Sequence, residues 1–333
     1  MNGRRLGVYA LSLADEDLTP VEVLRLAHGA GLGAVLFPTA FSLSTGLDEA
    51  ELAEVRDHGT DLGVEVVVGF PNLHPHRLDD SVPLLRAGDG DALRGFARLA
   101  AATDAFGVAD VPVIIGLIED RYARLVPWQR QLDAFVALTG VLRPILADHN
   151  LRLAVKTHEE ISTYDVVRLV ERCGEDLITV GFDPVNVLVN LEDPVAAAAR
   201  VAPYTRHVYV DDALFAAAAG GADRLLCPVG DGLVDWPVVT GLIPPAGRTV
   251  RYWIELHRGQ FQVRPFDPEW MTNHPDLSVA EYATTVRAMS ASQPGHQALR
   301  VLQASQARPT SRLGAALEAC ERLGLREAAT APA

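Results

Sequence analysis

The sequence predicts a single (β/α)8 TIM barrel, an α/β fold, followed by appended C-terminal helices. Three observations predict it: short apolar runs rich in β-branched residues alternate with longer helical patterns, eight such runs occur, and no long linker interrupts them. Barrels of this type commonly span a length such as 333 residues as one domain. We therefore expect the barrel over residues 1–292 and a helical extension with a tail over residues 293–333.

Each of the eight predicted strands is a short apolar run of the kind that is buried on both faces of a parallel sheet. The helical patterns between the runs carry start and stop signals. Over residues 19–31, for example, Thr19 precedes Pro20 at the first helical position, and a glycine ends the pattern. In chain order the predicted strands are residues 6–13, 33–38, 64–70, 111–117, 151–158, 177–184, 206–212 and 249–256.

Two long loops interrupt the alternation of strands and helices. Residues 71–90 follow the third strand and residues 257–278 follow the eighth, so both lie on the carboxyl-end face, where barrel enzymes place their chemistry. Loops of this length are uncommon in compact domains unless they are functional. We expect both to act as lids, with Trp270 of the second loop covering the pocket.

Composition excludes several classes of partner. The net charge of −14 disfavours a phosphate backbone and an anionic membrane surface, because both need a basic face. No run approaches the ~20 apolar residues that span a bilayer, and the three cysteines show no zinc or redox spacing. The sequence thus predicts a cytoplasmic, soluble protein with a small-molecule substrate and no nucleic-acid or membrane partner. It leaves a homodimer through the C-terminal helices open.

The chain contains one lysine, Lys156, among its 29 lysines and arginines. Arginine suffices here wherever the surface needs positive charge, so an ordinary solvated role for the one lysine is hard to support. Unlike arginine, lysine loses its proton readily when it is desolvated, and it then serves as a base or an amine nucleophile. Lys156 also lies at the end of an apolar run, and this position predicts a functional role for it.

Polar residues gather at the ends of the fourth to eighth predicted strands. Side chains at the carboxyl ends of barrel strands form the active sites of these folds. Some members of the set can equally be helix caps or ion pairs with nearby arginines. The set comprises Glu119, Asp120, Arg121, Lys156, His158, Glu159, Glu160, Asp183, Asn186, His207, Tyr209, Asp211, Asp212, Glu255 and His257.

Four segments of the chain stand in order: VGFDPVNVL (180–188), HVYVDDA (207–213), PVGDGLVDW (228–236) and YWIELHRG (252–259). Together they resemble the successive signatures of the sugar phosphate isomerase/epimerase family, which has a xylose isomerase-like barrel. The resemblance covers most of residues 5–290. It implies one divalent metal held by a glutamate, an aspartate, a histidine and a second glutamate from the last four strands, with the two glutamates moving protons on either side of the substrate carbon.

The ligand pattern of that family holds at two positions and fails at two. Asp183 matches the aspartate and Glu255 the last glutamate, whereas Lys156 stands at the first glutamate and Tyr209 at the histidine. An ammonium in place of a carboxylate reverses the local charge, and tyrosine is a poor substitute for imidazole as a metal ligand. We therefore expect no cofactor. If a divalent metal (Mn, Mg or Zn) is bound, Asp183 and Glu255 would hold it with a borrowed histidine.

The residues support an enzyme that keeps proton-transfer chemistry and replaces the electrophile. It would isomerise, epimerise or cleave a small sugar-like or keto-acid hydroxy-carbonyl compound, and its catalytic residues would be Lys156, Glu255, Asp183, Tyr209 and His158. Lys156 would act as a base, as a charge that stabilises an enolate, or as a Schiff-base amine. The predicted substrate contacts are Glu119, Asn186, His207, His257, Arg258 and Trp270.

Two alternatives stay open at this point. A non-catalytic relative would use Lys156, Asp183 and Glu255 as a structural salt-bridge network around a ligand. A metal-dependent isomerase or epimerase would rebuild its ligand set from nearby histidines.

Overall fold

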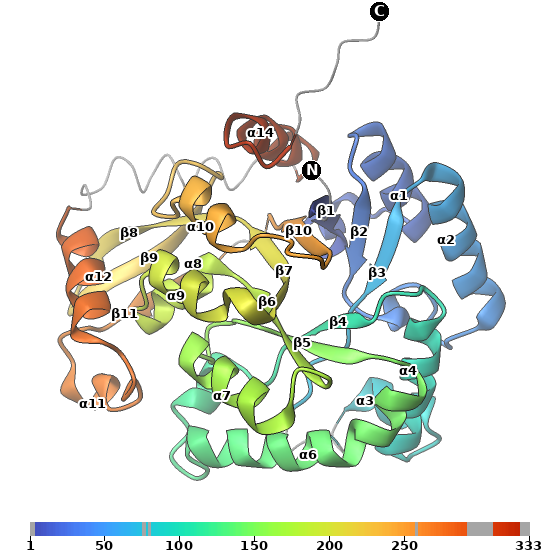
Figure 1. Ribbon diagram of the computed structural model, residues 1–333, viewed down its shortest axis with the longest axis horizontal. Coiled ribbons are helices and arrows are strands. Elements are labelled where there is room, and N and C mark those ends of the chain that lie inside the picture. Colours follow the sequence, from blue (N-terminus) through green and yellow to red (C-terminus); the bar gives the residue numbers. More distant parts are fainter. Residues whose placement is uncertain (1–3, 75–77, 79–80, 257–258, 292–308, 327–333) are drawn as a thin grey trace, which may run out of the picture.

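The computed structural model describes residues 4–74, 78, 81–256, 259–291 and 309–326. Its main sheet has eight parallel strands in the order β3-β2-β1-β10-β7-β6-β5-β4. Each overlaps one of the predicted runs, so the barrel prediction is confirmed (Figure 1). The strands are β1 (Arg4–Tyr9), β2 (Ala34–Phe37), β3 (Glu65–Val68), β4 (Asp110–Val113), β5 (Arg152–Lys156), β6 (Ile178–Phe182), β7 (Thr205–Val210) and β10 (Val250–Ile254).

The sheet closes on itself between the residues that follow β3 and the carboxyl end of β4. There the backbone N–H of Phe70 donates to the carbonyl of Pro112 at 2.8 Å, and that of Leu73 donates to the carbonyl of Ile114 at 3.0 Å. Side chains fill the interior, as expected for an eight-stranded barrel. A buried cluster within it contains Ala34, Leu36, Val67, Val108, Tyr209 and Trp253.

Helices cover the outside of the barrel (Figure 1). The first begins as predicted: the Thr19 hydroxyl accepts the N–H of Glu22, and the Glu22 carboxylate accepts the N–H of Thr19, which satisfies two otherwise unpaired donors. The helices are α1 (Pro20–Gly29), α2 (Glu49–Leu62), α3 (Val82–Ala87), α4 (Ala92–Asp104), α5 (Ile118–Arg121), α6 (Trp128–Asp148), α7 (Thr163–Cys173), α8 (Pro184–Val187), α9 (Pro194–Val201), α10 (Trp236–Leu242), α11 (Pro268–Met271), α12 (Val279–Ala291) and α14 (Pro309–Arg322).

A small antiparallel sheet, which the sequence did not predict, lies beside the barrel (Figure 1). It consists of β8 (Asp212–Ala218), β9 (Gly221–Cys227) and β11 (Gln260–Val263), in the order β11-β9-β8. The predicted loop over residues 257–278 therefore contains β11 and α11. The predicted loop over residues 71–90 likewise contains α3.

The C-terminal helix α14 packs against the first βα unit of the barrel. It contacts the 3-10 helix η1 (Ala10–Glu16), and Arg326 just beyond α14 donates to the carbonyl of Ala30 at 2.8 Å. Of the predicted extension over residues 293–333, the described part is residues 309–326. No helix in the described ranges is long and apolar enough to cross a membrane.

Candidate active site

A cavity of about 290 Å³ lies at the carboxyl ends of the barrel strands. One side carries charged and hydroxyl groups from the ends of β1, β5, β7 and β10, namely Tyr9, Lys156, His158, Tyr209 and Glu255. The other side follows the ends of β2, β3 and β4 and is mostly apolar. Its residues are Leu36, Phe37, Pro38, Thr39, Gly69, Phe70, Pro71, Asn72, Pro112, Val113 and Ile114, and Leu11 from η1 completes the lining.

Lys156 lies between two carboxylates on the polar side of the cavity. Its Nζ atom is 2.7 Å from Oε2 of Glu255 and 2.9 Å from Oδ2 of Asp183. The same atom lies 4.0 Å from the centre of the Tyr209 ring, in cation–π contact. The structure thus brings four of the five predicted catalytic residues together, and the fifth, His158, lines the same cavity.

The environment keeps Lys156 positively charged. The residue is 7% exposed, and burial alone would lower the pKa of its amine. The carboxylates of Glu255 and Asp183 outweigh burial and raise the pKa of Lys156 well above its ordinary value. An ammonium has three N–H donors. Two carboxylates hold the ammonium, and Lys156 also lines the cavity, so its charge faces the space that a ligand would occupy.

The first residues of α8 hold the carboxylate of Asp183 by hydrogen bonds. Its Oδ1 accepts the N–H of Val185 at 3.2 Å, and the side-chain amide of Asn186 donates to Oδ2 at 2.8 Å. Asn186 therefore orients the carboxylate that holds Lys156. Asn186 is not among the described residues that line the cavity, and its bond to Asp183 supports a positioning role, while its predicted contact with the substrate stays a prediction.

Asp211 adds a third carboxylate, which the predicted set of catalytic residues omitted. It follows β7 directly and is buried, and its carboxylate lies within 4.8 Å of those of Asp183 and Glu255. Burial first, and then repulsion by Asp183 and Glu255, raise the pKa of Asp211 well above its ordinary value. A neutral Asp211 would leave one ammonium facing two carboxylates. The available signal in the sequence was its position at the end of a strand.

The residues at this site do not fit the divalent metal that the family resemblance implies. The carboxylates of Asp183, Asp211 and Glu255 are close enough to share an ion. The Lys156 ammonium, however, takes the place of a cation between two of them. Tyr209 presents the face of its ring to that position instead of a ligand atom. A divalent ion would also have to sit beside a positive charge, which Coulomb repulsion opposes.

His158, Glu159 and Glu160 form a second group of close ligand atoms, within 4.8 Å of one another. Nε2 of His158 is 2.8 Å from Glu159, and Nδ1 is 2.5 Å from Glu160. Burial alone would lower the pKa of His158, but the two carboxylates raise it to about 10. An imidazolium with both N–H groups engaged in this way has no ring nitrogen left for a metal or a substrate. This arrangement argues against the predicted proton transfer by His158.

Tyr9 is a cavity residue that the sequence did not single out. Its ring meets that of Tyr209 edge to face, with centroids 6.4 Å apart. Burial first, and then the charge of Glu255, raise the pKa of Tyr9 to about 12, and burial raises the pKa of Tyr209 well above its ordinary value. Both hydroxyls therefore stay protonated and can donate hydrogen bonds. The one signal for Tyr9 in the sequence was its place in the first predicted strand.

Three other predicted substrate contacts lie away from the cavity. Glu119 is exposed on α5, and Trp270 on α11 stacks on Tyr122 with centroids 6.3 Å apart. His207 lies two residues before Tyr209, on the same side of β7 but deeper in the barrel, where burial lowers its pKa to about 4. Its ring is held by the carbonyl of Asp110 and the indole N–H of Trp253, each at 2.9 Å. His257 and Arg258 lie outside the described residues.

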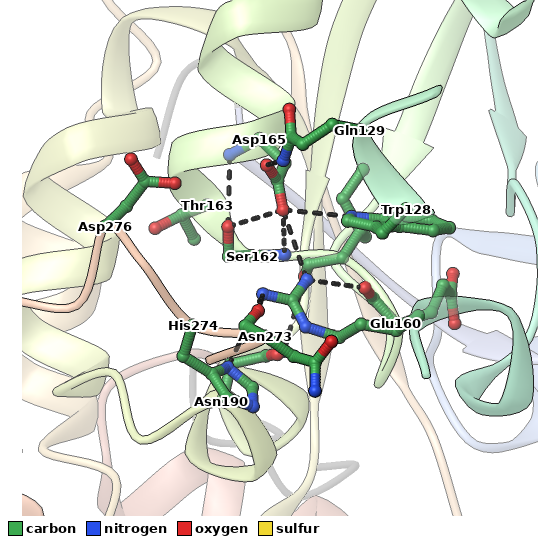
Figure 2. A network of polar contacts seen from close by, with 12 residues as sticks. Trp128, Gln129, Glu160, Ser162, Thr163, Asp165, Asn190, Asn273, His274 and Asp276 are labelled. Atoms are coloured by element: carbon green, nitrogen blue, oxygen red, sulfur yellow. Dashed lines mark hydrogen bonds and ion pairs between the residues drawn. The ribbon is translucent and has the colours of Figure 1, made fainter. Parts of the chain in front are cut away.

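Figure 2 shows a buried network next to these strand ends. The guanidinium of Arg121 donates to the carbonyl of Glu160 at 2.8 Å, to the carboxylate of Asp165 at 3.2 Å and to the carbonyl of Asn273 at 2.6 Å. Asp165 also accepts the indole N–H of Trp128 at 3.2 Å. Arg121 thus ties the segment after α11 to the residues that follow β5, and its two terminal nitrogens are both bonded to the protein.

Comparison with known proteins decides the family. A family model described as the xylose isomerase-like TIM barrel matches residues 24–272. The chain belongs to this family. The resemblance found in the sequence is therefore confirmed, and this xylose isomerase-like barrel carries an ammonium and a tyrosine ring where its relatives were expected to hold metal ligands.

The relatives of this xylose isomerase-like barrel are distant. The 3-oxo-isoapionate decarboxylase of Pectobacterium atrosepticum is 24% identical over 244 residues, which cover 69% of this chain and 79% of that protein. A D-psicose 3-epimerase from Clostridium cellulolyticum H10, solved with D-tagatose, has a TM-score of 0.59 at 10% identity, covering 90% and 99% of the two chains. A xylose isomerase-like protein from Mycobacterium smegmatis, solved with magnesium, has a TM-score of 0.57 at 14% identity, covering 86% and 97%. The two structures establish a shared fold.

Proposed function

We propose that the protein is an enzyme that acts on a small hydroxy-carbonyl compound through an enolate or enediolate, as an isomerase, epimerase or lyase. The observation that carries this proposal is the Lys156 ammonium, fixed by Glu255 and Asp183 and facing the cavity. A D-psicose 3-epimerase shares the fold, and a relative is a 3-oxo-isoapionate decarboxylase. Both kinds of reaction develop negative charge on a carbonyl oxygen next to the reacting carbon.

The Lys156 ammonium would donate to the substrate carbonyl oxygen. Glu255 also lines the cavity, and its carboxylate would take the proton from the neighbouring carbon. The C–H electron pair would then form the C=C bond of the enolate, and the charge on the oxygen would lie beside the ammonium. In an isomerisation, Glu255 would return the proton to the other carbon while the proton of the neighbouring hydroxyl moves to the enolate oxygen, so that carbonyl and hydroxyl exchange places. In an epimerisation, a second donor of the cavity, the hydroxyl of Tyr9 or Tyr209, would protonate the same carbon from the other face, and exchange with solvent would restore both groups. In a cleavage, the breaking C–C bond would supply the same electron pair.

Of the three roles considered for Lys156, fixed charge is the one that the geometry favours. Its raised pKa leaves no free amine at neutral pH for an iminium or for proton abstraction. The hydroxyls of Tyr9 and Tyr209 would add neutral hydrogen bonds to the same oxygen. Treatment with borohydride in the presence of substrate should therefore leave the mass of the protein unchanged.

We also propose that this chemistry needs no divalent metal, because the ammonium already supplies the cation. Dialysis against EDTA should leave the activity unchanged, and metal analysis of the active protein should find no stoichiometric ion. An ion bound in one-to-one ratio whose removal abolishes activity would overturn this part of the proposal and favour a rebuilt metal site.

The direct test is deuterium exchange, followed by NMR in D2O, at the carbon next to the carbonyl of 1-hydroxybutan-2-one and of 3-oxo acids. Lys156→Met and Glu255→Gln should each reduce exchange by at least about a hundredfold, the scale of a lost electrostatic or acid–base group. Glu119→Gln, on the exposed α5, is the matched control and should exchange like the wild type. If the wild type gives no exchange while ligands still bind, the non-catalytic alternative holds.

A further inference from the structure

The two sides of the cavity differ sharply in chemistry. The ends of β1, β5, β7 and β10 present two tyrosine hydroxyls, an ammonium, a carboxylate and the imidazole of His158. The ends of β2, β3 and β4 present mostly hydrocarbon, and among the described residues their polar side chains are Thr39 and Asn72. A ligand that reaches the Lys156 ammonium with one end must lay its other end against this apolar side.

The polar side chain of Asn72 is already used by the protein. Its Nδ2 donates to the carbonyl of Gly116 at 2.8 Å, and its Oδ1 accepts the N–H of Gly116 at 2.8 Å. Both ends of the amide are therefore engaged in fixing the loop after β4. Of the described side chains on the apolar side, the Thr39 hydroxyl remains for a ligand.

The backbone of the apolar side offers few groups either. Three of its residues are prolines, which have no N–H to donate: Pro38, Pro71 and Pro112. Several carbonyls accept hydrogen bonds between neighbouring strands of the barrel. That of Pro112 accepts the N–H of Phe70 at 2.8 Å, and that of Phe37 accepts the N–H of Gly69 at 2.9 Å.

Such a surface discriminates between two kinds of substrate. A polyol tail would lose water from each hydroxyl and find almost no partner in return, which is unfavourable. A hydrocarbon tail of the same length gains affinity, by about fourfold for each buried methylene. We infer that the substrate is a small hydroxy-carbonyl compound whose far end is a hydrocarbon chain or ring. This inference rests on the proposed function for the orientation of the reacting end.

A matched pair of ketones tests the inference by isothermal titration calorimetry on the full chain. L-erythrulose and 1-hydroxybutan-2-one share the hydroxymethyl ketone head and differ by two hydroxyls on the tail. We expect 1-hydroxybutan-2-one to bind at least tenfold more tightly, and 1-hydroxyhexan-2-one more tightly still. Equal or tighter binding of L-erythrulose, or no detectable binding of either hydrocarbon-tailed ketone, would overturn the inference.

A substitution on the apolar side provides a second test, through the ratio of the affinities for the two ketones. Ile114→Thr places a hydroxyl on this side and should reduce the affinity ratio of the pair at least threefold. Val141→Thr is the control, since Val141 is 56% exposed on α6, and it should keep the ratio of the wild type. An unchanged ratio in Ile114→Thr would contradict the inference. If the wild type prefers the hydrocarbon-tailed ketone but shows no exchange activity, the proposed enzyme is refuted and the ligand class is supported. If the wild type shows exchange but prefers L-erythrulose, the enzyme is supported and the ligand class is refuted.

Discussion

The Nζ atom of Lys156 lies 2.7 Å from Oε2 of Glu255, although 99 positions separate the two residues in the chain. The pair forms because β5 and β10 end at the same face of one barrel. The single lysine of the chain is therefore a buried cation at the centre of a carboxylate cluster. Such a charge is expensive to bury alone, so its partners determine both the stability and the chemistry of the site.

Replacing Lys156 by methionine should destabilise the protein by roughly 3–5 kcal/mol at pH 7, because it leaves the carboxylates of Glu255 and Asp183 buried without their cation. Urea unfolding measures the effect. Arg172→Met is the control, since that arginine is half-exposed in its pair with Asp133 and should cost less than about 1 kcal/mol. A loss below about 1 kcal/mol for Lys156→Met would show that the carboxylates do not depend on the ammonium.

The two buried aspartates of the cluster should respond differently to neutralisation. Asp183→Asn keeps an oxygen to cap α8 but removes the charge that holds Lys156, so we expect a loss of roughly 2–4 kcal/mol and a marked fall in activity. Asp211→Asn imitates the neutral acid that its raised pKa predicts, so it should change the free energy of unfolding by less than about 1 kcal/mol. The reverse order in urea unfolding would reassign which aspartate carries the charge.

The barrel could be predicted from the sequence because each strand is a compact apolar run and the runs alternate with capped helices. The cluster around Lys156 could be predicted because all parallel strands of a barrel end at the same face. The strands β8 and β9 could not be predicted in this way. The alanine-rich run of β8 has high helix propensity, and it is extended here because β9 pairs with it along its whole length.

The remaining differences between the predicted and the observed site concern the position of a residue along its strand, and not the strand to which it belongs. His207 and Tyr209 point to the same side of β7, and the sequence does not fix the residue at which β7 ends, which decides how deep each side chain lies. His158 was correctly expected at the cavity, but its binding to Glu159 and Glu160 depends on the path of the backbone after β5. Such side-chain choices are set by tertiary packing.

Arg121→Met should destabilise the protein by roughly 3–5 kcal/mol, because the buried carboxylate of Asp165 loses a cation and two backbone carbonyls lose their donors. Arg124→Met is a matched control from the same segment. Its side chain is 87% exposed in a pair with Glu269, and its loss should cost less than about 0.5 kcal/mol. Thermal unfolding followed by circular dichroism compares the two, and equal melting temperatures would show that the network of Figure 2 does not hold the segment after α11.

His158 should make the stability of the protein depend on pH in a defined window. Its pKa is raised from 6.5 to about 10 in the folded state, so the folded protein holds this proton more tightly than the unfolded chain does. The stabilisation is therefore fully present below pH 6.5 and is lost as the pH rises toward 10. Relative to His158→Gln, the wild type should lose roughly 2–4 kcal/mol of its advantage across this window, measured by urea unfolding. The pKa of Lys156 lies above its ordinary 10.5, so its own contribution is lost only at higher pH and does not overlap.

The control is His58→Gln on α2, where the histidine side chain is 37% exposed and its removal should change the free energy of unfolding by less than about 0.5 kcal/mol. A constant difference between the wild type and His158→Gln from pH 6.5 to 10 would mean that the imidazole is not held as a cation by Glu159 and Glu160.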